Sequence, residues 1–262
     1  MLKKRSSWAI TRSVVFALVL REVRGKLGKK RMGAFWFVFE PMAHILVLLM
    51  AFSAIRGRSL PGVEYPLFLV NGLVPFLALK NIALKGMEAI RANRGLAAYR
   101  QVKPFDMVLA RAIVEAALML CVHILILAGL GWFFDYPVAI ARPLEWMGTL
   151  ALGYVLAFGS ALIFCVIIDA VPEAGIFIRI MYLPLYIISG VIFPLWLVPT
   201  RFIDLLLWNP YVHLVELARE NSITYYPTTA GISYFYPAIW AFLSLFIGIS
   251  LYRARRLHLV AS

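Results

Sequence analysis

The chain has little charge and few cysteines, and both shortages exclude classes of protein. Only 15% of its 262 residues are charged, while 63% are hydrophobic, which lies outside the usual composition of a soluble domain. The two cysteines, Cys121 and Cys165, lie inside apolar runs without the paired spacing of a disulfide framework or a zinc site. We therefore expect a membrane protein with packing cysteines and no metal.

Catalytic patterns are also missing from the sequence. It contains no GxxxxGK[ST] phosphate-binding loop, so the chain is not expected to hydrolyse ATP itself. Its 13 acidic residues are scattered. One class of membrane enzyme to consider is a membrane-embedded transferase acting on lipid-linked sugars. Such an enzyme would need carboxylates gathered in one loop. We predict that the chain is not an enzyme by itself and binds no cofactor of its own.

Long apolar runs are present instead, and they predict an all-α membrane protein with six transmembrane helices in one domain, residues 1–262. About 20 mainly apolar residues cross a bilayer as a helix. The predicted spans are residues 34–54, 65–83, 107–134, 144–168, 175–193 and 233–252. The sequence shows no internal repeat, so an inverted-repeat carrier has no support.

The N-terminal segment is basic and too short in its apolar part to span. The run Ser13–Leu20 resembles a signal peptide, but Arg21-Glu22-Val23-Arg24 stands where a cleavage site would be. Eight apolar residues cannot cross the bilayer. We predict an uncleaved amphipathic helix at about residues 6–27, lying in the cytoplasmic interface.

The positive charges predict the orientation. The net charge is +13, and with the N-terminus inside, all but five of the Lys and Arg residues fall on cytoplasmic segments, as the positive-inside rule requires. The five exceptions are Arg56, Arg58, Arg142, Arg201 and Arg219. An even number of spans then places both termini in the cytoplasm, and the basic charge needs no nucleic-acid partner.

The outer segment between the fifth and sixth spans has an unusual apolar piece. Leu195–Trp208 is interrupted by Pro199 and Asp204 and is too short to cross. Two short re-entrant helices would satisfy their backbone hydrogen bonds at that depth. A pair of surface helices with interfacial Trp196 and Trp208 fits equally well.

Ionisable residues inside spans suggest function by default, and two pairs occur here. Glu40 and His44 are four residues apart in the first span, and Arg111 and Glu115 are four apart at the start of the third. Because i,i+4 pairs lie side by side on a helix, we predict mutual neutralisation within each pair rather than a proton relay.

The fifth span carries a polar and aromatic stripe. Its members share one helical face, at offsets of 0, 3, 7, 10 and 14. They are Arg179, Tyr182, Tyr186, Ser189 and Phe193. Flat aromatic faces with hydroxyl tips could let sugar rings slide past; an ordinary helix-packing seam is the alternative.

The segment 88–103 joins the second and third spans on the cytoplasmic side and mixes apolar with basic residues. Such a composition suits a helix seated against another protein, although a charged loop at the lipid headgroups remains an alternative. Its apolar members are Ile90, Leu96 and Tyr99, and its basic members include Arg91, Arg94 and Arg100.

Three stretches of the chain resemble a known family. They are LGKKRMGAFWFVFEP at 27–41, ANRGLAAYRQVKPFDMVLARAIVE at 92–115, and SGVIFPLWLVPTRFIDLLLWNPYVHLVELARE at 189–220. Together they are similar to the membrane subunits of type-two ABC exporters of capsular polysaccharide, the KpsM-like group. The likeness covers essentially the whole chain.

The resemblance implies a bacterial inner-membrane homodimer around a central channel. Each subunit would dock on one of two copies of a separate ATPase chain, which binds ATP and Mg²⁺, through a coupling helix at about 88–100. The implied coupling residues are Ile90, Arg91, Asn93, Arg94, Tyr99 and Arg100.

The implied substrate is a lipid-linked acidic polysaccharide, handed on through a periplasmic adaptor leading to an outer-membrane channel. Related exporters of O-antigen, teichoic acid or another glycolipid are the alternative. Arg179 would meet a negative charge of the lipid anchor or the glycan. The resemblance also implies a periplasmic gate at about residues 193–211. The implied channel residues are Arg179, Tyr182, Tyr186, Phe193, Trp196, Trp208, Trp36 and Phe39.

Overall fold

The structure, a computed structural model, is built from long apolar helices. It describes residues 6–27, 33–56, 59–60, 62–97, 99 and 101–261. Within that part, four helices are long and apolar enough to cross a membrane. They are α3 (Tyr65–Met87), α6 (Pro104–Phe134), α7 (Pro143–Ala170) and α11 (Phe235–Ala261). The all-α membrane class is thus confirmed.

Further elements connect and flank these four helices. The helices among them are α1 (Ser7–Leu27), α2 (Gly33–Arg56), α4 (Ala89–Ala92), α5 (Arg94–Ala97), α8 (Ala174–Ile188), the 3₁₀ turn η1 (Leu195–Leu197), α9 (Thr200–Leu206) and α10 (Pro210–Ser222). The strands β1 (Ser59–Leu60) and β2 (Val63–Glu64) form a two-residue antiparallel hairpin, a small departure from the predicted all-α fold, with Gly62 at a positive φ of 78° in the turn.

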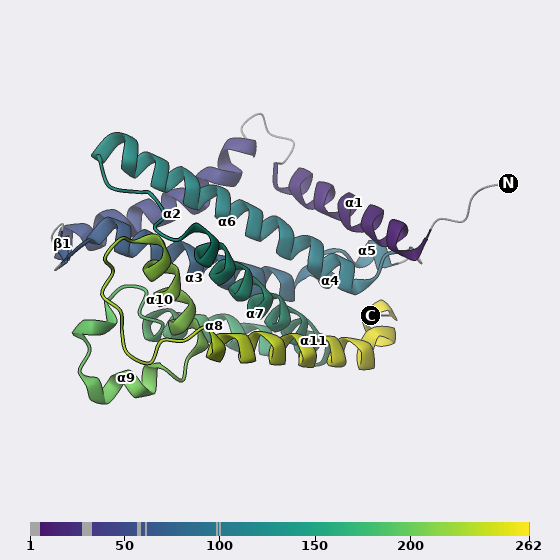
Figure 1. Cartoon of the computed structure of the whole chain (residues 1–262). Coiled ribbons are helices and arrows are strands. Elements are labelled where there is room, and N and C mark those ends of the chain that lie inside the picture. Colours follow the sequence, from purple (N-terminus) through teal and green to yellow (C-terminus); the bar gives the residue numbers. More distant parts are fainter. Residues whose placement is uncertain are drawn as a thin grey trace.

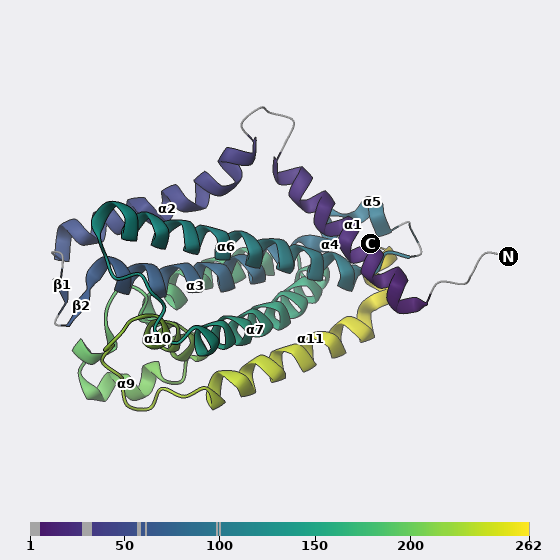
Figure 2. The same cartoon turned by 45° about the horizontal axis from the view of Figure 1, so that its top comes forward.

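The long helices run side by side between two distinct ends (Figure 1). One end carries α4, α5, α1 and the C-terminal end of α11, and the other carries β1, α9 and α10. The 45° view keeps the same division, with α1 lying obliquely across the first end (Figure 2). The placement of α1 and the end of α11 together agrees with the predicted orientation of both termini on one side.

The fifth predicted span is shorter than expected. We predicted a helix over 175–193, whereas α8 has 15 residues and stops at Ile188, a length of about 22 Å against a hydrocarbon core of about 30 Å. The helix stops because Gly190 adopts a left-handed φ of 67°, a common way to end a helix. The residues after it form turns.

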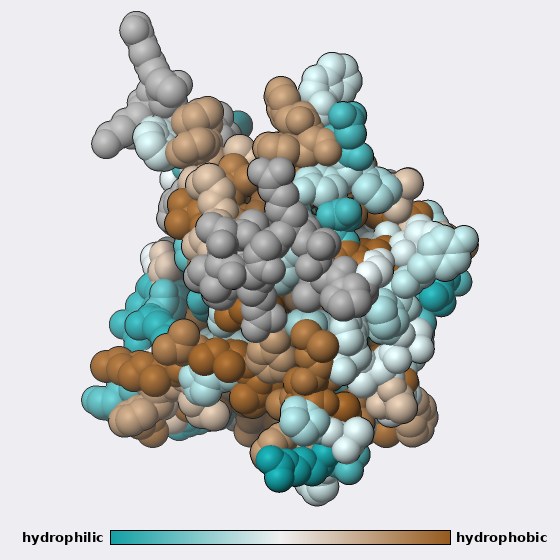
Figure 3. Space-filling model, turned by 90° about the vertical axis from the view of Figure 1, so that its left-hand side faces the viewer, coloured by the Kyte–Doolittle hydropathy of each residue, from teal (hydrophilic) through white to brown (hydrophobic). Residues whose placement is uncertain are grey.

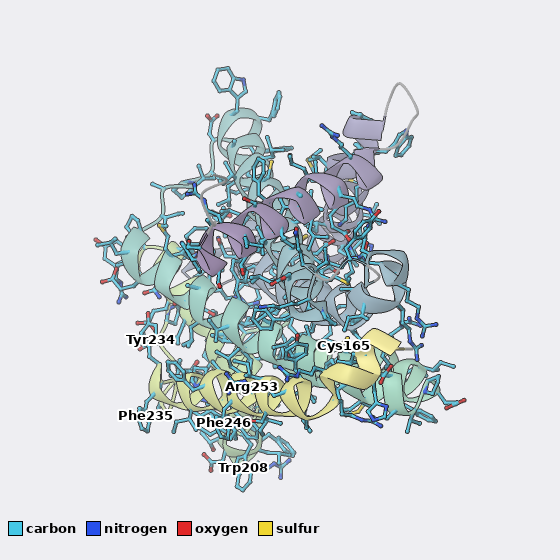
Figure 4. All side chains as sticks on the ribbon, turned by 90° about the vertical axis from the view of Figure 1, so that its right-hand side faces the viewer. Cys165, Trp208, Tyr234, Phe235, Phe246 and Arg253 are labelled. Carbon is cyan, nitrogen blue, oxygen red and sulfur yellow. The ribbon has the colours of Figure 1, made fainter. Side chains whose placement is uncertain are left out.

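The helix α3 is the centre of the fold. Nearly all of its side chains are buried, and it packs against α6, α7, α10 and α2. In contrast, α11 packs along α7 and exposes large apolar side chains on its other side. Figure 4 shows Phe235 and Phe246 pointing outward from α11, with Trp208 beyond them. The apolar runs of α3 and α11 look alike in sequence, but only α3 is enclosed.

The helix at the N-terminus is confirmed, and its faces differ from the prediction. We expected separate apolar and basic faces over residues 6–27. The exposed side of α1 instead mixes Trp8, Phe16 and Leu20 with Arg12 and Arg24. Long arginine side chains can lay their stems on apolar surface and keep the charge in water, so this mixed face still suits a membrane interface.

Candidate functional site

The predicted coupling helix is two short helices. We expected one helix over about 88–100, and the structure has α4 and α5 with a break at Asn93, whose φ is −120°. Asparagine and the following Gly95 are poor helix formers, which explains the interruption. We call residues Glu88 to Ala97 the α4–α5 segment.

The α4–α5 segment has an inner and an outer side. Ile90 and Asn93 are buried, each only 6% exposed, and Ile90 packs with residues of α1, α6 and α7. Arg91, Arg94 and Tyr99 are exposed. Predicted Arg100 lies outside the described residues. The exposed basic and aromatic side chains therefore form an outward surface at the end that carries α1.

Two polar contacts attach this segment to α7 and α8. The Arg179 guanidinium of α8 forms an ion pair with Glu88, and the Arg91 guanidinium donates to the carbonyl oxygen of Ile168 in α7. Arg179 was expected to face the substrate. The structure provides a partner for it within its own chain, at the start of the α4–α5 segment.

The predicted Arg111–Glu115 pair is wrong. Arg111 donates to Glu22 of α1, with Nη2–Oε2 at 2.9 Å and Nε–Oε2 at 3.1 Å, while Glu115 pairs with Lys26 of α1 and, at 2.8 Å, with Lys85 of α3. Glu22 and Lys26 are themselves four residues apart, so their charges match those of α6 in complementary order. Partners on another helix therefore replaced the predicted neighbours on the same helix.

These five charges gather where α1 crosses the ends of α3 and α6, and we call them the α1–α6 charge cluster: Glu22, Lys26, Lys85, Arg111 and Glu115. The carboxylate of Glu115 is fully enclosed, and the side chain of Glu22 is 10% exposed. Burial lowers the pKa of the Lys26 ammonium, and Glu115 opposes that shift. Breaking a buried pair from one side is costly, because it leaves an unpaired charge, so the cluster holds α1 firmly in place.

The other predicted pair is only partly described. The side chain of Glu40 lies outside the described residues, and His44 is exposed on α2. Of the aromatic residues assigned to the channel from the same helix, Trp36 is exposed and Phe39 is half-buried, with their rings in edge contact at 5.4 Å. Their predicted role as channel residues stays a prediction.

The aromatic stripe of α8 packs inside its own chain. The hydroxyl of Tyr182 lies 3.2 Å from that of Tyr211 in α10, the Tyr186 ring lies against Phe76 of α3, and Ser189 Oγ accepts from Asn209 at 3.0 Å. These contacts fit the packing-seam interpretation. The remaining surface of α8 is apolar and exposed, with Ile176, Phe177, Ile180, Met181 and Leu183.

The predicted gate contains a short helix at the bundle end. All seven residues of α9 are exposed or half-buried, and Trp208 is 78% exposed. Figure 3 looks onto this end, where hydrophobic and hydrophilic patches alternate. Phe193 is half-buried, and Trp196 packs edge-on against Phe68 and Tyr226. That these helices re-enter the membrane stays a prediction.

Arg219, which the charge distribution assigns to the periplasmic side, connects several elements at the end of the bundle that carries α9 and α10. Arg219 of α10 is fully buried, and its guanidinium donates to the carbonyl oxygens of Phe68, Gly190 and Val191 at 3.0, 2.8 and 2.7 Å. It also pairs with Glu216 at 2.8 Å. It thereby joins α10 to α3 and to the turn after α8.

The sequence carried a signal for this site. Glu216 and Arg219 are three residues apart within HLVELARE, a spacing that places them on one helical face. Two further features stabilise the pair, since Tyr226 donates to Glu216 at 2.9 Å and the guanidinium lies 3.7 Å above the Phe68 ring.

The family match and the similar proteins both cover most of the chain. Residues 13–223 match the model of the family described as ABC-2 type transporter. The chain is 40% identical to the polysialic acid transport protein KpsM of Escherichia coli, over 98% of this chain and 99% of that protein.

Two further similar proteins come from other bacteria. One is the capsule polysaccharide export inner-membrane protein BexB of Haemophilus influenzae, 27% identical over 83% of this chain and 82% of BexB. The other is CtrC of Neisseria meningitidis serogroup B, with the same descriptive name, 26% identical over 84% of each chain.

Proposed function

The chain belongs to the ABC-2 type transporter membrane family, and from this premise we propose that it is the channel-forming inner-membrane subunit of an exporter of capsular polysaccharide. The observation that carries the proposal is the 40% identity that extends over 98% of the chain to a polysaccharide transport protein. The long apolar helices supply the membrane domain that such a subunit needs.

The finer parts of the proposal concern partners. The subunit works as a homodimer with two copies of a separate ATPase, which binds ATP and Mg²⁺ and docks on the exposed face of the α4–α5 segment. Exposed Arg91, Arg94 and Tyr99 support this docking surface. The substrate is an acidic polysaccharide on a lipid anchor, passed to a periplasmic adaptor. The exposed apolar faces of α8 and α9 supply surface for the second subunit and the gate.

Deleting the gene tests the export function directly. We expect polysaccharide to accumulate inside the cell and to disappear from the surface, because synthesis continues without a path across the membrane. The two pools are quantified separately, with the wild-type gene restored on a plasmid as the control. Unchanged pools would refute capsular export, and loss of polymer from both pools would favour a synthetic role.

Two variants test how Arg179 acts. If it acts through Glu88, Arg179→Gln and Glu88→Gln lower surface polymer equally and the double variant lowers it no further. We expect a loss of at most about fivefold, because exposed ion pairs contribute roughly 0.2–1 kcal/mol. If Arg179 instead meets the substrate's charge, Arg179→Gln impairs export while Glu88→Gln does not. Surface polymer per cell is the measurement.

A further inference from the structure

A hydrogen bond connects α1 to the α4–α5 segment. The side-chain nitrogen Nδ2 of Asn93 donates to Glu22 Oε1 at 3.1 Å and to the Ala89 carbonyl oxygen at 2.9 Å. Asn93 is 6% exposed and sits at the break between α4 and α5. The Asn93 amide therefore stabilises the break between α4 and α5 and also bonds to α1, through a residue 71 positions earlier in the sequence.

The acceptor of this bond is rigidly held. Arg111 of α6 contacts both oxygens of the Glu22 carboxylate, with Nη2 at 3.0 Å from Oε1 and 2.9 Å from Oε2. Two-point binding by a guanidinium fixes both the position and the plane of a carboxylate. Glu22 is thus shared among α1, α6 and the α4–α5 segment.

We infer that Glu22 is a positioning residue for transport, which makes α1 and the start of α6 move together with the α4–α5 segment when the ATPase acts. The inference rests on the proposed function, because it takes the α4–α5 segment as the ATPase docking surface. It assigns α1 a part in transmitting the motion, beyond lying at the membrane surface. Asn93 is 6% exposed and the side chain of Glu22 10%, although both line an open pocket together with Lys26 and Arg111.

An isosteric exchange separates this role from simple packing. Asn93→Asp places a second carboxylate against Glu22, and Glu22→Gln removes the charge that Arg111 holds. In the double variant E22Q/N93D, the glutamine amide is expected to donate to the aspartate, and the oxygen of the glutamine still accepts from Arg111. Side-chain size, total charge and the hydrogen bond between positions 22 and 93 are retained, with donor and acceptor reversed. The bond from residue 93 to the Ala89 carbonyl oxygen is lost both in Asn93→Asp and in the double variant, so these two are compared directly.

The experiment measures export and ATP hydrolysis together. The full chain is produced with its partner ATPase, and surface polymer in cells is compared with ATP hydrolysis by the purified complex. We expect each single variant to retain ATP hydrolysis while surface polymer falls roughly tenfold, the scale of one hydrogen bond to a charged group. The exchange should restore a clear part of the loss relative to Asn93→Asp, which lacks the same bond to Ala89. Recovery in a double variant is the sign of direct coupling.

Other outcomes overturn the inference. Wild-type export in both single variants, or an exchange no better than the worse single variant, contradicts it while leaving the export function intact. The single variants could also lose the protein itself or its ATPase from the purified complex, with no recovery in the double variant. That result would mean that the Glu22–Asn93 bond has a structural role only, and it would overturn the inference. Glu220→Gln is the control, because it breaks an Arg–Glu pair at the opposite end and should leave export per ATP unchanged.

The proposed function fails in a different way. If the ATPase does not co-purify with the wild-type chain, or if gene deletion leaves surface polymer unchanged, docking or export itself is wrong before any variant is compared. These two controls are run first, so that a failure of the positioning role is recognised separately.

Discussion

Replacing Arg219 with methionine is expected to destabilise the end of the bundle by about 3–5 kcal/mol, the cost of removing one partner from a buried ion pair, and to abolish export. Glu216 would lose its partner while remaining 2% exposed. The carbonyl oxygens of Phe68, Gly190 and Val191 would lose their donor.

The consequence reaches beyond α10. Because the guanidinium bonds the turn after α8 to α3, its loss frees the turn that leads into η1 and α9. The pocket is shaped for this side chain: a Cβ added at Gly72 would lie 2.1 Å from Arg219 Nη2. Arg219→Lys should recover little, because one ammonium cannot reproduce a planar fork of donors.

The measurement is the fraction of protein that stays monodisperse in detergent after graded heating, together with surface polymer. Arg142→Met is the matched control, since Arg142 belongs to a half-exposed pair with Glu220 at the same end and should change stability little. An Arg219→Met protein with wild-type heat resistance would contradict the assigned role of this residue.

A methyl group at Gly159 is expected to separate α11 from α7. A Cβ there would lie 2.5 Å from Ser244 Oγ and 2.6 Å from the backbone nitrogen of Leu245, and backbone atoms cannot turn aside as a side chain can. Gly248 of α11 lies at the same crossing, and a Cβ added to Gly248 would lie 2.9 Å from the carbonyl oxygen of Gly159. Small residues let membrane helices approach this closely.

Gly159→Ala should therefore cost about 3 kcal/mol, the upper part of the usual range for overpacking, in spite of alanine's better helix propensity. Gly148→Ala is the matched control on the same helix, because an added Cβ there meets no atom within 4 Å in the described part of the chain. Heat resistance in detergent is compared for the two. Equal heat resistance of the two variants would contradict the prediction, because it would show that α7 and α11 accommodate the added methyl group without loss of stability.

Much of the architecture was predictable because it depends on local sequence. Hydropathy over about 20 residues locates a span without knowledge of its neighbours, and α3, α6, α7 and α11 follow the predicted ranges closely. Boundaries set by backbone turns were harder, as the early stop of α8 at Gly190 and the break at Asn93 show.

The charged residues show where local patterns fail. Arg111 and Glu115 have the spacing of a helical pair, yet each binds a residue of α1 instead. Arg219 was counted among the outer charges and is fully buried. The partners of Arg111 and Glu115 on α1 lie 89 residues away. Arg219 pairs locally with Glu216, but the carbonyl oxygens that bury it belong to Phe68, Gly190 and Val191, which spacing along one helix cannot identify.

The sequence by itself determined the membrane class, the apolar runs that cross, the common side of the two ends and the family likeness, because hydropathy, charge distribution and motifs are properties of short stretches. Only the tertiary structure decided which charges meet: Glu22 with Arg111 and Asn93, Glu88 with Arg179, and Arg219 with the turn after α8. Such pairing depends on how helices cross in space, and that geometry is set by the packing of the whole bundle.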